Sequence, residues 1–479
     1  MKKILFAIII LSTFSFQAQD GVPKQWTLEA CIEYAYENNI DISQSKLDQL
    51  DADVNQADAV GNFLPSFNIN ANNNWNSGLT QNVVTGVLEN QVTRNFSMGA
   101  TVGVNIFNGL QNWRTLQRSK MAQLASLYAL EQMEDDIALF VANSYLQVLV
   151  SKQTLAILEE QNQVTQEQIE LAQAQVDAGT IPEGDVLDLQ ATNADEQQQI
   201  VVARNDVRIS LISLAQTLLI DDYENFNIAD ESYEVPITDI MNKSIDEIIE
   251  KSKEERYEVK IAEKNVEIAQ KNVEIAKSAY YPTLNGFFNY NTRESDLGRF
   301  INNGIDADNP ISQNLIGFEG TNGNAVFSPN FIVSEVGSRP FIDQLWRNDG
   351  ITYGVQLNIP VFNGLATRNN VKRNMIDLER NQNRLKQAEL DLESNVYQAY
   401  VDAQGAAKSY DAAQKTVEAR QTAYNYAKER FDVGMSNSFE LSQSKLNLTN
   451  AQNTLIRAKY DYIFSIKVLE LFFGIRPVE

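Results

Sequence analysis

The sequence of 479 residues contains no histidine and a single cysteine. Without histidine the chain can form neither a histidine-based catalytic triad nor a histidine-ligated metal site. One cysteine permits no intramolecular disulfide and no thiolate metal cluster, so the fold must be stabilised by packing or by assembly. No nucleophile with a matching base is evident either, and we therefore expect neither an enzymatic activity nor a cofactor.

Basic residues are also scarce, because 39 Lys and Arg stand against 63 Asp and Glu, which gives a net charge of −24. Binding to nucleic acid needs clustered Lys and Arg, so no nucleic-acid partner is expected. Beyond its first residues the chain has no run of the roughly 18 to 20 apolar residues that a membrane-spanning helix needs. If it enters a membrane, it does so with strands.

Residues 1–19 have the pattern of a secretory signal peptide. Lys2 and Lys3 form a basic start, residues 4–16 are apolar, and residues 17–19 are a polar exit. We therefore expect an exported protein. Cys31 lies in a segment that superficially resembles a lipoprotein processing box, but the helical spacing of the apolar residues around it favours a buried helix cysteine over a lipidated one.

The remaining chain contains a tandem duplication. The segment FNGL at residues 107–110 recurs at 362–365, and the same offset of 255 residues relates Gly179 to Gly434. Each copy has the same predicted order of helix, strand, long loop, strand, very long helix, sharp turn and helix. The expected domains are a first copy over 20–220, an acidic connector over 221–243 and a second copy over 244–479.

The very long helices are predicted over residues 110–178 and 365–433, neither of which contains proline. At 1.5 Å per residue each would be roughly 100 Å long, which exceeds any compact domain. In the second helix apolar residues and alanines recur every seven positions or a multiple of seven, from Leu378 through Leu392 to Ala427. This persistence indicates coiled-coil packing with close approach of the helices.

Four segments alternate between apolar and polar residues, which is typical of strands. Their lengths suit outer-membrane strands, whose apolar face meets lipid, although a soluble sheet with one wet face has the same alternation. Export and the very long helices favour the membrane. Four strands cannot close a barrel, so several chains must share one. The strands are predicted at about 65–76, 95–107, 282–291 and 351–362. The long loops 77–94 and 292–349 are expected at an extracellular rim, and the prolines of the second mark it as irregular.

The duplicated order, the two FNGL segments and the two helix-tip glycines resemble the TolC-like outer-membrane efflux proteins. The resemblance covers nearly the whole chain after the signal peptide. It implies a homotrimer in the outer membrane of a Gram-negative cell, mainly α with a twelve-stranded β-barrel that continues into a periplasmic coiled-coil tunnel of twelve helices. The connector would lie in an equatorial belt. Outer-membrane lipid, a periplasmic adaptor (membrane fusion) protein and an inner-membrane transporter are the implied partners, and the function is a passive exit duct for efflux or type I secretion.

The same resemblance points to the helix tips as the functional site. Gly179 and Gly434 suit the left-handed residue that ends a long helix. The implied adaptor contacts are at Gly179, Thr180, Gly434, Met435 and Ser436, and the implied acidic pore constriction or gate is formed by Asp185, Asp188, Glu440 and Gln443.

Local chemistry offers a plainer interpretation of some of these residues. Asp185 and Glu440 also fit ordinary first-turn carboxylates that favour a helix dipole, and Thr180 with Glu183 fits a capping box. Gln443 is neutral, which would weaken an inner ring of charge. A secreted structural coiled-coil protein without membrane insertion stays open as an alternative function, and the sequence does not name a cargo.

Overall fold

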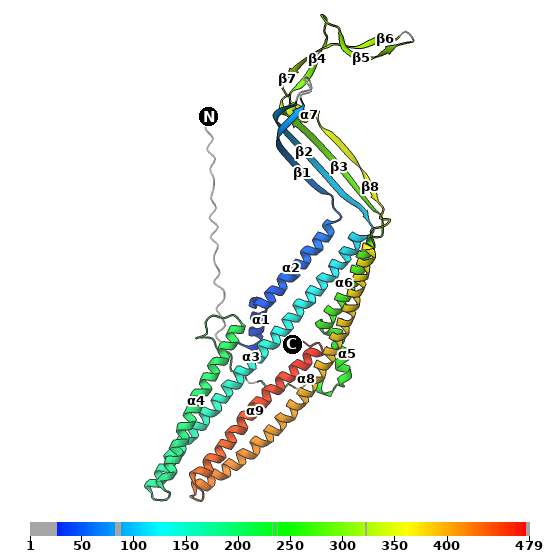
Figure 1. The fold of residues 1–479 in the computed structure, drawn as a ribbon. Coiled ribbons are helices and arrows are strands. Elements are labelled where there is room, and N and C mark those ends of the chain that lie inside the picture. Colours follow the sequence, from blue (N-terminus) through cyan, green and yellow to red (C-terminus); the bar gives the residue numbers. More distant parts are fainter. Residues whose placement is uncertain (1–25, 82–87, 232, 237, 321–322, 476–479) are drawn as a thin grey trace, which may run out of the picture. The chain divides into compact units, whose positions relative to one another are not determined.

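The computed structural model describes residues 26–81, 88–231, 233–236, 238–320 and 323–475 (Figure 1). The predicted signal peptide lies outside these residues. The chain forms two compact units. The helical unit comprises Met1–Val54, Lys120–Ile268 and Asp377–Glu479, and the sheet unit comprises Asn55–Ser119 and Ala269–Ile376.

Four helices recur in both copies with the same lengths of 11, 22, 67 and 35 residues. This identity confirms the predicted duplication. A 3-10 turn, η1 (Ile240–Asn242), lies between the copies. The first copy has α1 (Leu28–Asn38), α2 (Ile40–Gly61), α3 (Gln111–Asp177) and α4 (Glu183–Thr217), and the second has α5 (Ile245–Glu255), α6 (Tyr257–Ser278), α8 (Ala366–Asp432) and α9 (Ser438–Phe472).

The first helix of each copy is set by local capping and by one extended residue. The side chains of Thr27 and Ser244 accept backbone N–H groups three residues on, which satisfies a free donor at the start of α1 and of α5. Asn39 and Arg256 then have extended backbone, which separates α1 from α2 and α5 from α6 at equivalent places. The break is therefore as much a part of the repeat as the helices are.

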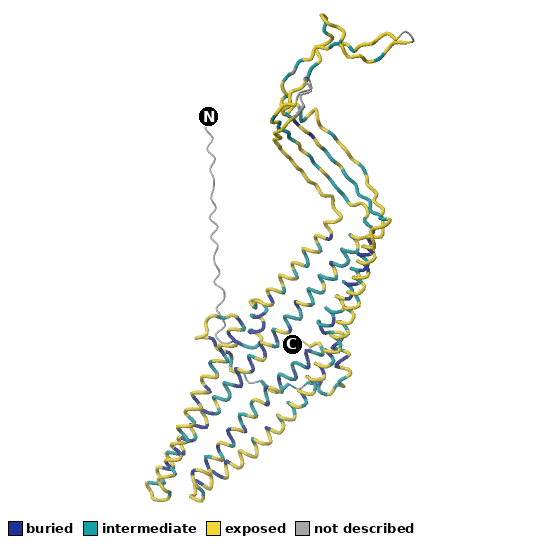
Figure 2. Tube along the Cα trace, in the orientation of Figure 1, coloured by how far each residue is buried: buried dark blue, intermediate teal, exposed yellow. Residues whose placement is uncertain are grey.

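The helical unit is held together by buried apolar seams along its helices (Figure 2). Leu392, Ala413 and Ala427 of the predicted heptad series are buried, as expected for a coiled-coil contact. Cys31 is fully buried in α1, and burial raises the pKa of its thiol to about 12. The prediction of a buried helix cysteine is confirmed. The connector joins the same core, because Ile228 pairs with Trp26 in a parallel bridge.

The sheet unit contains one four-stranded antiparallel sheet with the strand order β1-β2-β3-β8. Its edges are β1 and β8. The strands are β1 (Ser66–Gln81), β2 (Leu88–Asn108), β3 (Thr283–Ser295) and β8 (Gly350–Asn358).

The register of this sheet places the four apolar stripes on one face. Phe67 lies opposite Val102, Val102 opposite Phe288, and Phe288 opposite Tyr353. The neighbouring row, which points to the other face, joins residues Asn68, Thr101, Asn289 and Thr352. Phe67 is 64% exposed and Tyr353 78% exposed, so no part of the chain that the structure describes covers the apolar face at these two edge-strand residues.

The strands replace much of the first predicted loop, and the prediction that 292–349 is irregular is wrong. Most of 77–94 continues the β1–β2 hairpin, apart from residues 82–87, which lie outside the described residues. Residues 292–349 contain more ordered structure. Pro310 and Pro329 stand at strand ends, where a missing N–H costs little, and therefore do not prevent pairing. This region forms β4 (Arg299–Ile305), β5 (Ile311–Glu319), β6 (Asn324–Pro329), β7 (Phe331–Val336) and α7 (Phe341–Arg347), with β4 paired to β7 and β5 to β6.

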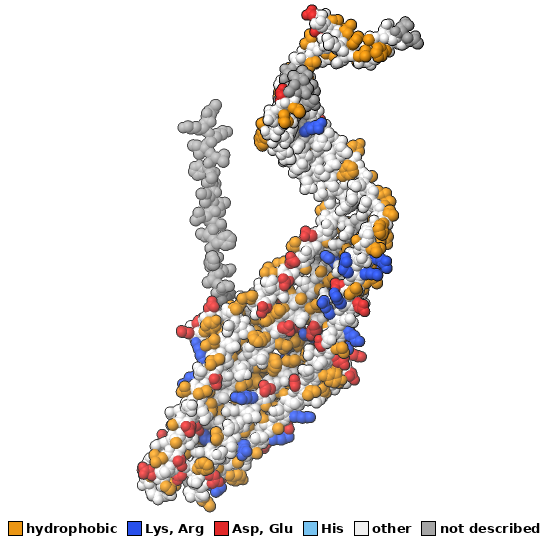
Figure 3. Space-filling view, in the orientation of Figure 1, with side chains coloured by type: hydrophobic (Ala, Val, Ile, Leu, Met, Phe, Trp, Pro, Cys, Tyr) orange, Lys and Arg blue, Asp and Glu red, His pale blue; other side chains and the backbone are white. Residues whose placement is uncertain are grey.

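Charge is distributed unevenly over the chain. In the view of Figure 3 red and blue side chains gather on the helices, whereas the visible face of the β1-β2-β3-β8 sheet is almost free of them. Among the described residues, no helix combines the length and the apolar character needed to cross a bilayer.

Candidate functional site at the helix tips

Both long helices end in the same left-handed turn. Gly179 has φ +71° and Gly434 has φ +73°. After α3 the N–H of Thr180 donates to the carbonyl of Gln175 at 2.9 Å, and after α8 the N–H of Met435 donates to the carbonyl of Arg430 at 2.8 Å. These bonds define a Schellman motif in each copy. A side chain larger than hydrogen at either glycine would strain the turn.

The predicted capping box at the start of α4 is wrong. The hydroxyl of Thr180 donates to the carbonyl of Gln175 at 2.9 Å, so it completes the end of α3. The cap of α4 is Pro182, which makes no side-chain bond. In the second copy, by contrast, the side chain of Asn437 caps α9 by accepting the N–H of Glu440 at 3.0 Å.

Asp185 joins the tips of the two copies within one protomer. Its Oδ1 accepts the backbone N–H of Ser438 at 3.2 Å and the hydroxyl of Ser438 at 2.7 Å. The same hydroxyl lies 3.3 Å from Oδ2 of Asp188. Ser438 is fully buried, so this contact fixes the first turn of α9 against the first turn of α4. Sequence reasoning missed Ser438, because a serine beside a helix start carries no sign of a distant partner.

Glu440 has a basic partner in its own protomer. Nη1 of Arg430 lies 2.7 Å from Oε1 of Glu440, and their side chains are 53% and 46% exposed. Arg430 sits in the last turn of α8, where a cation favours the helix dipole. Gln443 donates a hydrogen bond within its own helix, to Asn447 at 3.4 Å. The structure therefore brings Asp185 and Asp188 to one partner and leaves Glu440 and Gln443 with separate ones.

Apolar side chains are exposed around the second-copy turn. Val433 is 69% exposed, Met435 74% and Phe439 69%. Ser436 differs, because its hydroxyl is buried and has no hydrogen-bond partner among the described residues. The tip therefore offers both an acidic patch and an apolar one.

A buried lysine lies two turns of α9 above the tip. The side chain of Lys445 is 3% exposed, and its Nζ lies 2.9 Å from Oε1 of Glu196 on α4. Nζ also donates to the carbonyl of Gln161 and to the hydroxyl of Thr165, both on α3. The hydroxyl of Thr165 in turn donates to Oε2 of Glu196 at 2.6 Å. Burial lowers the pKa of Lys445, while the carboxylate of Glu196 acts in the opposite direction.

Further polar links join α3 to the second copy along the helices. Gln168 donates to the hydroxyl of Tyr424 at 3.0 Å, and Gln153 donates to that of Tyr460 at 2.6 Å. Both tyrosines are buried. No local pattern in the sequence predicts these pairs, because the two residues of each pair belong to different copies.

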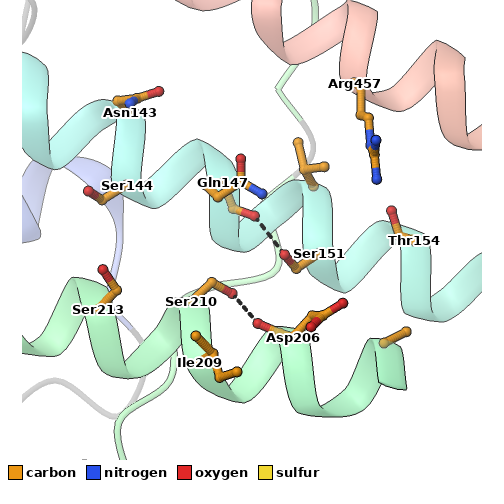
Figure 4. A pocket seen from close by; sticks show the side chains of 12 residues that line it. Asn143, Ser144, Gln147, Ser151, Thr154, Asp206, Ile209, Ser210, Ser213 and Arg457 are labelled. Atoms are coloured by element: carbon orange, nitrogen blue, oxygen red, sulfur yellow. Dashed lines mark hydrogen bonds between the residues drawn. The ribbon is translucent and has the colours of Figure 1, made fainter. Parts of the chain in front are cut away.

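A groove of about 470 Å³ lies between α3 and α4 (Figure 4). Its wall carries several hydroxyls, but Ser151 donates to the carbonyl of Gln147 and Ser210 to that of Asp206, within their own helices. Arg457 of α9 reaches over the groove. No histidine exists to act as a base, and the described residues contain no cluster of acids or cysteine suited to a metal ion.

Comparison with known proteins identifies the class. The sequence model of the outer membrane efflux proteins matches residues 31–218 and 343–471, about two thirds of the chain. The chain therefore belongs to the outer membrane efflux protein family. None of the curated proteins matches it. Its place is the outer membrane, and it serves there as an exit duct for efflux, as predicted.

Several solved structures share the fold. The CmeC outer membrane channel of Campylobacter jejuni has a TM-score of 0.71 at 16% identity, covering 99% of this chain and 93% of that chain. CusC has a TM-score of 0.71 at 16% identity, with 96% of each chain covered. VceC of Vibrio cholerae has a TM-score of 0.70 at 12% identity, with 93% and 96% covered. At these identities the likeness concerns the fold, and it confirms the predicted fold class.

The family decides between the two functions left open by the sequence. An outer membrane efflux protein is a membrane-inserted duct, so the secreted structural coiled-coil alternative is set aside. The family is one of ducts rather than of enzymes.

Proposed function

We propose that three copies of this chain form one continuous exit duct. The observation that carries this proposal is the β1-β2-β3-β8 sheet, which has four strands, two open edges and one apolar face. Open edges are not tolerated in hydrocarbon, because their N–H and C=O groups have no partner there. Pairing β1 of one copy with β8 of the next removes every edge, and three copies supply twelve strands. The apolar face then meets outer-membrane lipid.

The helices would continue this barrel as a tunnel in the periplasm. The polar links between α3 and the second-copy helices hold each protomer's share of the wall together. The duct itself carries out no chemistry, and an inner-membrane transporter supplies the energy for export. This division of labour explains why neither a catalytic group nor a resident cofactor is needed.

The tips would form the periplasmic mouth and the site of docking. Asp185, Asp188 and Glu440 place carboxylates near the symmetry axis, and Gln443 adds a neutral ring, which together would favour cations. The turns at Gly179, Thr180, Gly434, Met435 and Ser436 would contact a periplasmic adaptor protein. The exposed Met435 supports such a contact, because it offers apolar area beside the acidic patch.

The experiment that tests the proposal measures mass and export together. Purified protein in detergent should be a trimer by native mass spectrometry, and Gly179→Val and Gly434→Val should keep that trimer but lose dye export, because valine is strained at positive φ. Gly405→Ala, in the middle of α8 with open space around it, is the control and should export normally. A membrane-inserted monomer would contradict the shared barrel, and normal export by both valine variants would remove the turns from the functional site.

A further inference from the structure

The short helix α7 covers the part of β3 that extends past the end of β8. Strand β8 pairs with β3 only as far as Asn291, which leaves the last residues of β3 without a strand on that side. Nε2 of Gln344 donates to the carbonyl of Ser295 at 2.9 Å, and Oε1 of Gln344 accepts the N–H of Ser295 at 3.2 Å. A side chain of α7 therefore satisfies the β3 backbone where a strand would otherwise do so.

Helix α7 packs on the apolar face of the sheet. The ring of Phe341 lies 5.1 Å from that of Phe96, and the guanidinium of Arg94 lies 5.7 Å from the Phe341 ring. Phe96 lies on the same face as Val102, whose row across the sheet is apolar. The direct neighbours of Phe96 are the polar Asn73 and Glu294, and Glu294 is paired with Arg94 at 2.7 Å. Thr292 donates to the carbonyl of Leu345 at 2.6 Å and so fixes the helix from the same side.

The outer side of α7 is apolar and uncovered. Ile342 is 60% exposed and Trp346 is 73% exposed. Residues four apart lie on the same side of a helix, so these two side chains form one ridge beside the packed one. Arg339 and Arg347 flank the ridge, and neither makes an ion pair with any described residue. An exposed tryptophan with neighbouring arginines is typical of a segment at a membrane surface.

We propose that α7 is an interfacial lipid anchor. This inference rests on the proposed function, in which the apolar face of the sheet meets lipid. Ile342 and Trp346 insert at the boundary between headgroups and acyl chains, and Arg339 and Arg347 meet the anionic headgroups. The continuity of α7 with the apolar face, through Phe341, selects lipid as the occupant.

Quenching of tryptophan fluorescence by brominated lipid tests this placement. The chain has four tryptophans, and a variant with Trp26→Phe, Trp75→Phe and Trp113→Phe keeps only Trp346. Reconstituted in phosphatidylglycerol-containing vesicles, it should lose roughly half of its emission to bromine placed high on the acyl chains, and less to bromine near the methyl ends. If the triple variant does not assemble, Trp346→Phe is compared with the otherwise natural chain and should reduce the shallow-quenched part of the emission. The part that stays belongs to Trp75, which is 64% exposed on the apolar face of the sheet.

Two further single-tryptophan proteins separate this inference from the proposed function. Tyr353→Trp as the sole tryptophan reports on the apolar face of β8, where the native side chain is 78% exposed. Trp26 as the sole tryptophan is the negative control, because it is 4% exposed in the core of the helical unit. Quenching at position 353 and not at Trp346 would overturn the anchor and leave the duct intact. Absence of quenching at position 353 would overturn the duct itself.

The emission wavelength assigns the occupant if Trp346 is not quenched. Blue-shifted, unquenched emission would place α7 against a neighbouring copy, and red-shifted emission would place it in water, and either result overturns the lipid anchor. Arg339→Gln with Arg347→Gln should reduce the quenching by anionic vesicles to the level seen with neutral ones, while the yield of trimer stays unchanged. Equal quenching in both lipids before the substitution would contradict the role given to the arginines.

Discussion

The amine of Lys445 lies where three helices of the helical unit meet. It has a carboxylate, a hydroxyl and a carbonyl as partners, contributed by α3 and α4, while Lys445 itself belongs to α9. A buried charge is tolerated only when it is paired and hydrogen-bonded. The cluster therefore links the second copy to the first copy, at a level two helical turns above the tip. This link is separate from the contact between Asp185 and Ser438.

We predict that Lys445→Met destabilises the protein by about 3 kcal/mol. The side chain of Glu196 is only 15% exposed, so without Lys445 its charge would be nearly buried and unpaired. Adding Glu196→Gln should restore part of the lost stability, because a neutral amide then replaces the unpaired carboxylate. Thermal unfolding followed by helical circular dichroism measures both. Lys415→Met is the control, because Lys415 pairs with Asp411 on the surface at 72% exposure and should show no measurable change. A loss in the double variant equal to that of Lys445→Met would contradict an unpaired-charge mechanism.

For single residues, the sequence predicts the backbone conformation better than it predicts the partners of side chains. Gly179 and Gly434 could be identified from the residues, because a glycine that ends a long helix has one common conformation. Arg430, Ser438 and Lys445 could not, because each acquires its role from a partner that only folding brings near. A lysine inside a helix ordinarily belongs to the surface, and nothing local marks this one as buried.

The two FNGL segments are identical in sequence but lie in different surroundings. Gly109 has φ +67° and Gly364 has φ +64°, and the leucine after each is also left-handed, with φ +66° at Leu110 and +69° at Leu365. In each copy these two successive left-handed residues lie between the strand and the long helix that follows it. A non-glycine residue pays for this conformation, so the turn is strained in both copies.

We predict that Gly109→Ala is much more damaging than Gly364→Ala. A methyl group at residue 109 would lie 2.5 Å from the carbonyl oxygen of Ser278 and 2.8 Å from Cβ of Tyr281, whereas nothing lies within 4 Å at residue 364. Gly364→Ala should cost about 1 kcal/mol from φ alone. Gly109→Ala should lower the free energy of unfolding by at least about 2 kcal/mol more, because the backbone around residue 109 or Ser278 must move. Urea unfolding measures the stability of both variants. Equal losses of stability would show that the positive φ alone, and not the close contact at residue 109, sets the effect of the substitution.

The elements themselves followed from periodicity to different extents. The long helices and the four-stranded sheet could be predicted, because heptads and strict alternation repeat over many residues. The two strand pairs within 299–336 could not, because glycines and prolines interrupt strands that are too short to show a period. Nor could the sequence show that one register aligns all four apolar stripes, since register depends on pairing between the copies.

At the scale of the assembled duct, charge at the mouth depends on pairs within each protomer. Arg430 lies 2.7 Å from Glu440 and offsets its charge, whereas Asp185 faces a neutral serine. The acidic ring proposed from the family is therefore weaker at Glu440 than a count of carboxylates suggests. Asp185 also accepts the N–H of Ser438 at the start of α9, and Glu440 pairs with Arg430 in the last turn of α8. Each carboxylate therefore fits both the interpretation as part of a charged mouth and the interpretation as a group that stabilises a helix end.

We predict opposite changes in ion selectivity for two variants. Arg430→Gln should strengthen cation preference, because it unmasks Glu440 in each of the three chains. Asp185→Asn with Glu440→Gln should weaken it and reduce block by multivalent cations, most clearly at low salt where screening is least. Single-channel recording in planar bilayers measures both. Unchanged selectivity in both variants, with slightly lower stability, would assign these carboxylates to the helix ends alone.

The matched helix lengths of the two copies have a consequence for symmetry. Because each protomer carries two hairpins of 67 and 35 residues, a trimer would present six hairpin tips at nearly equal spacing, a pseudo-sixfold ring. The ring is sixfold in backbone only. One tip carries Thr180 and Pro182, and the other carries Met435 and Phe439, so the chemistry alternates around it. A partner that recognises shape could fill six places, and one that recognises side chains could fill three.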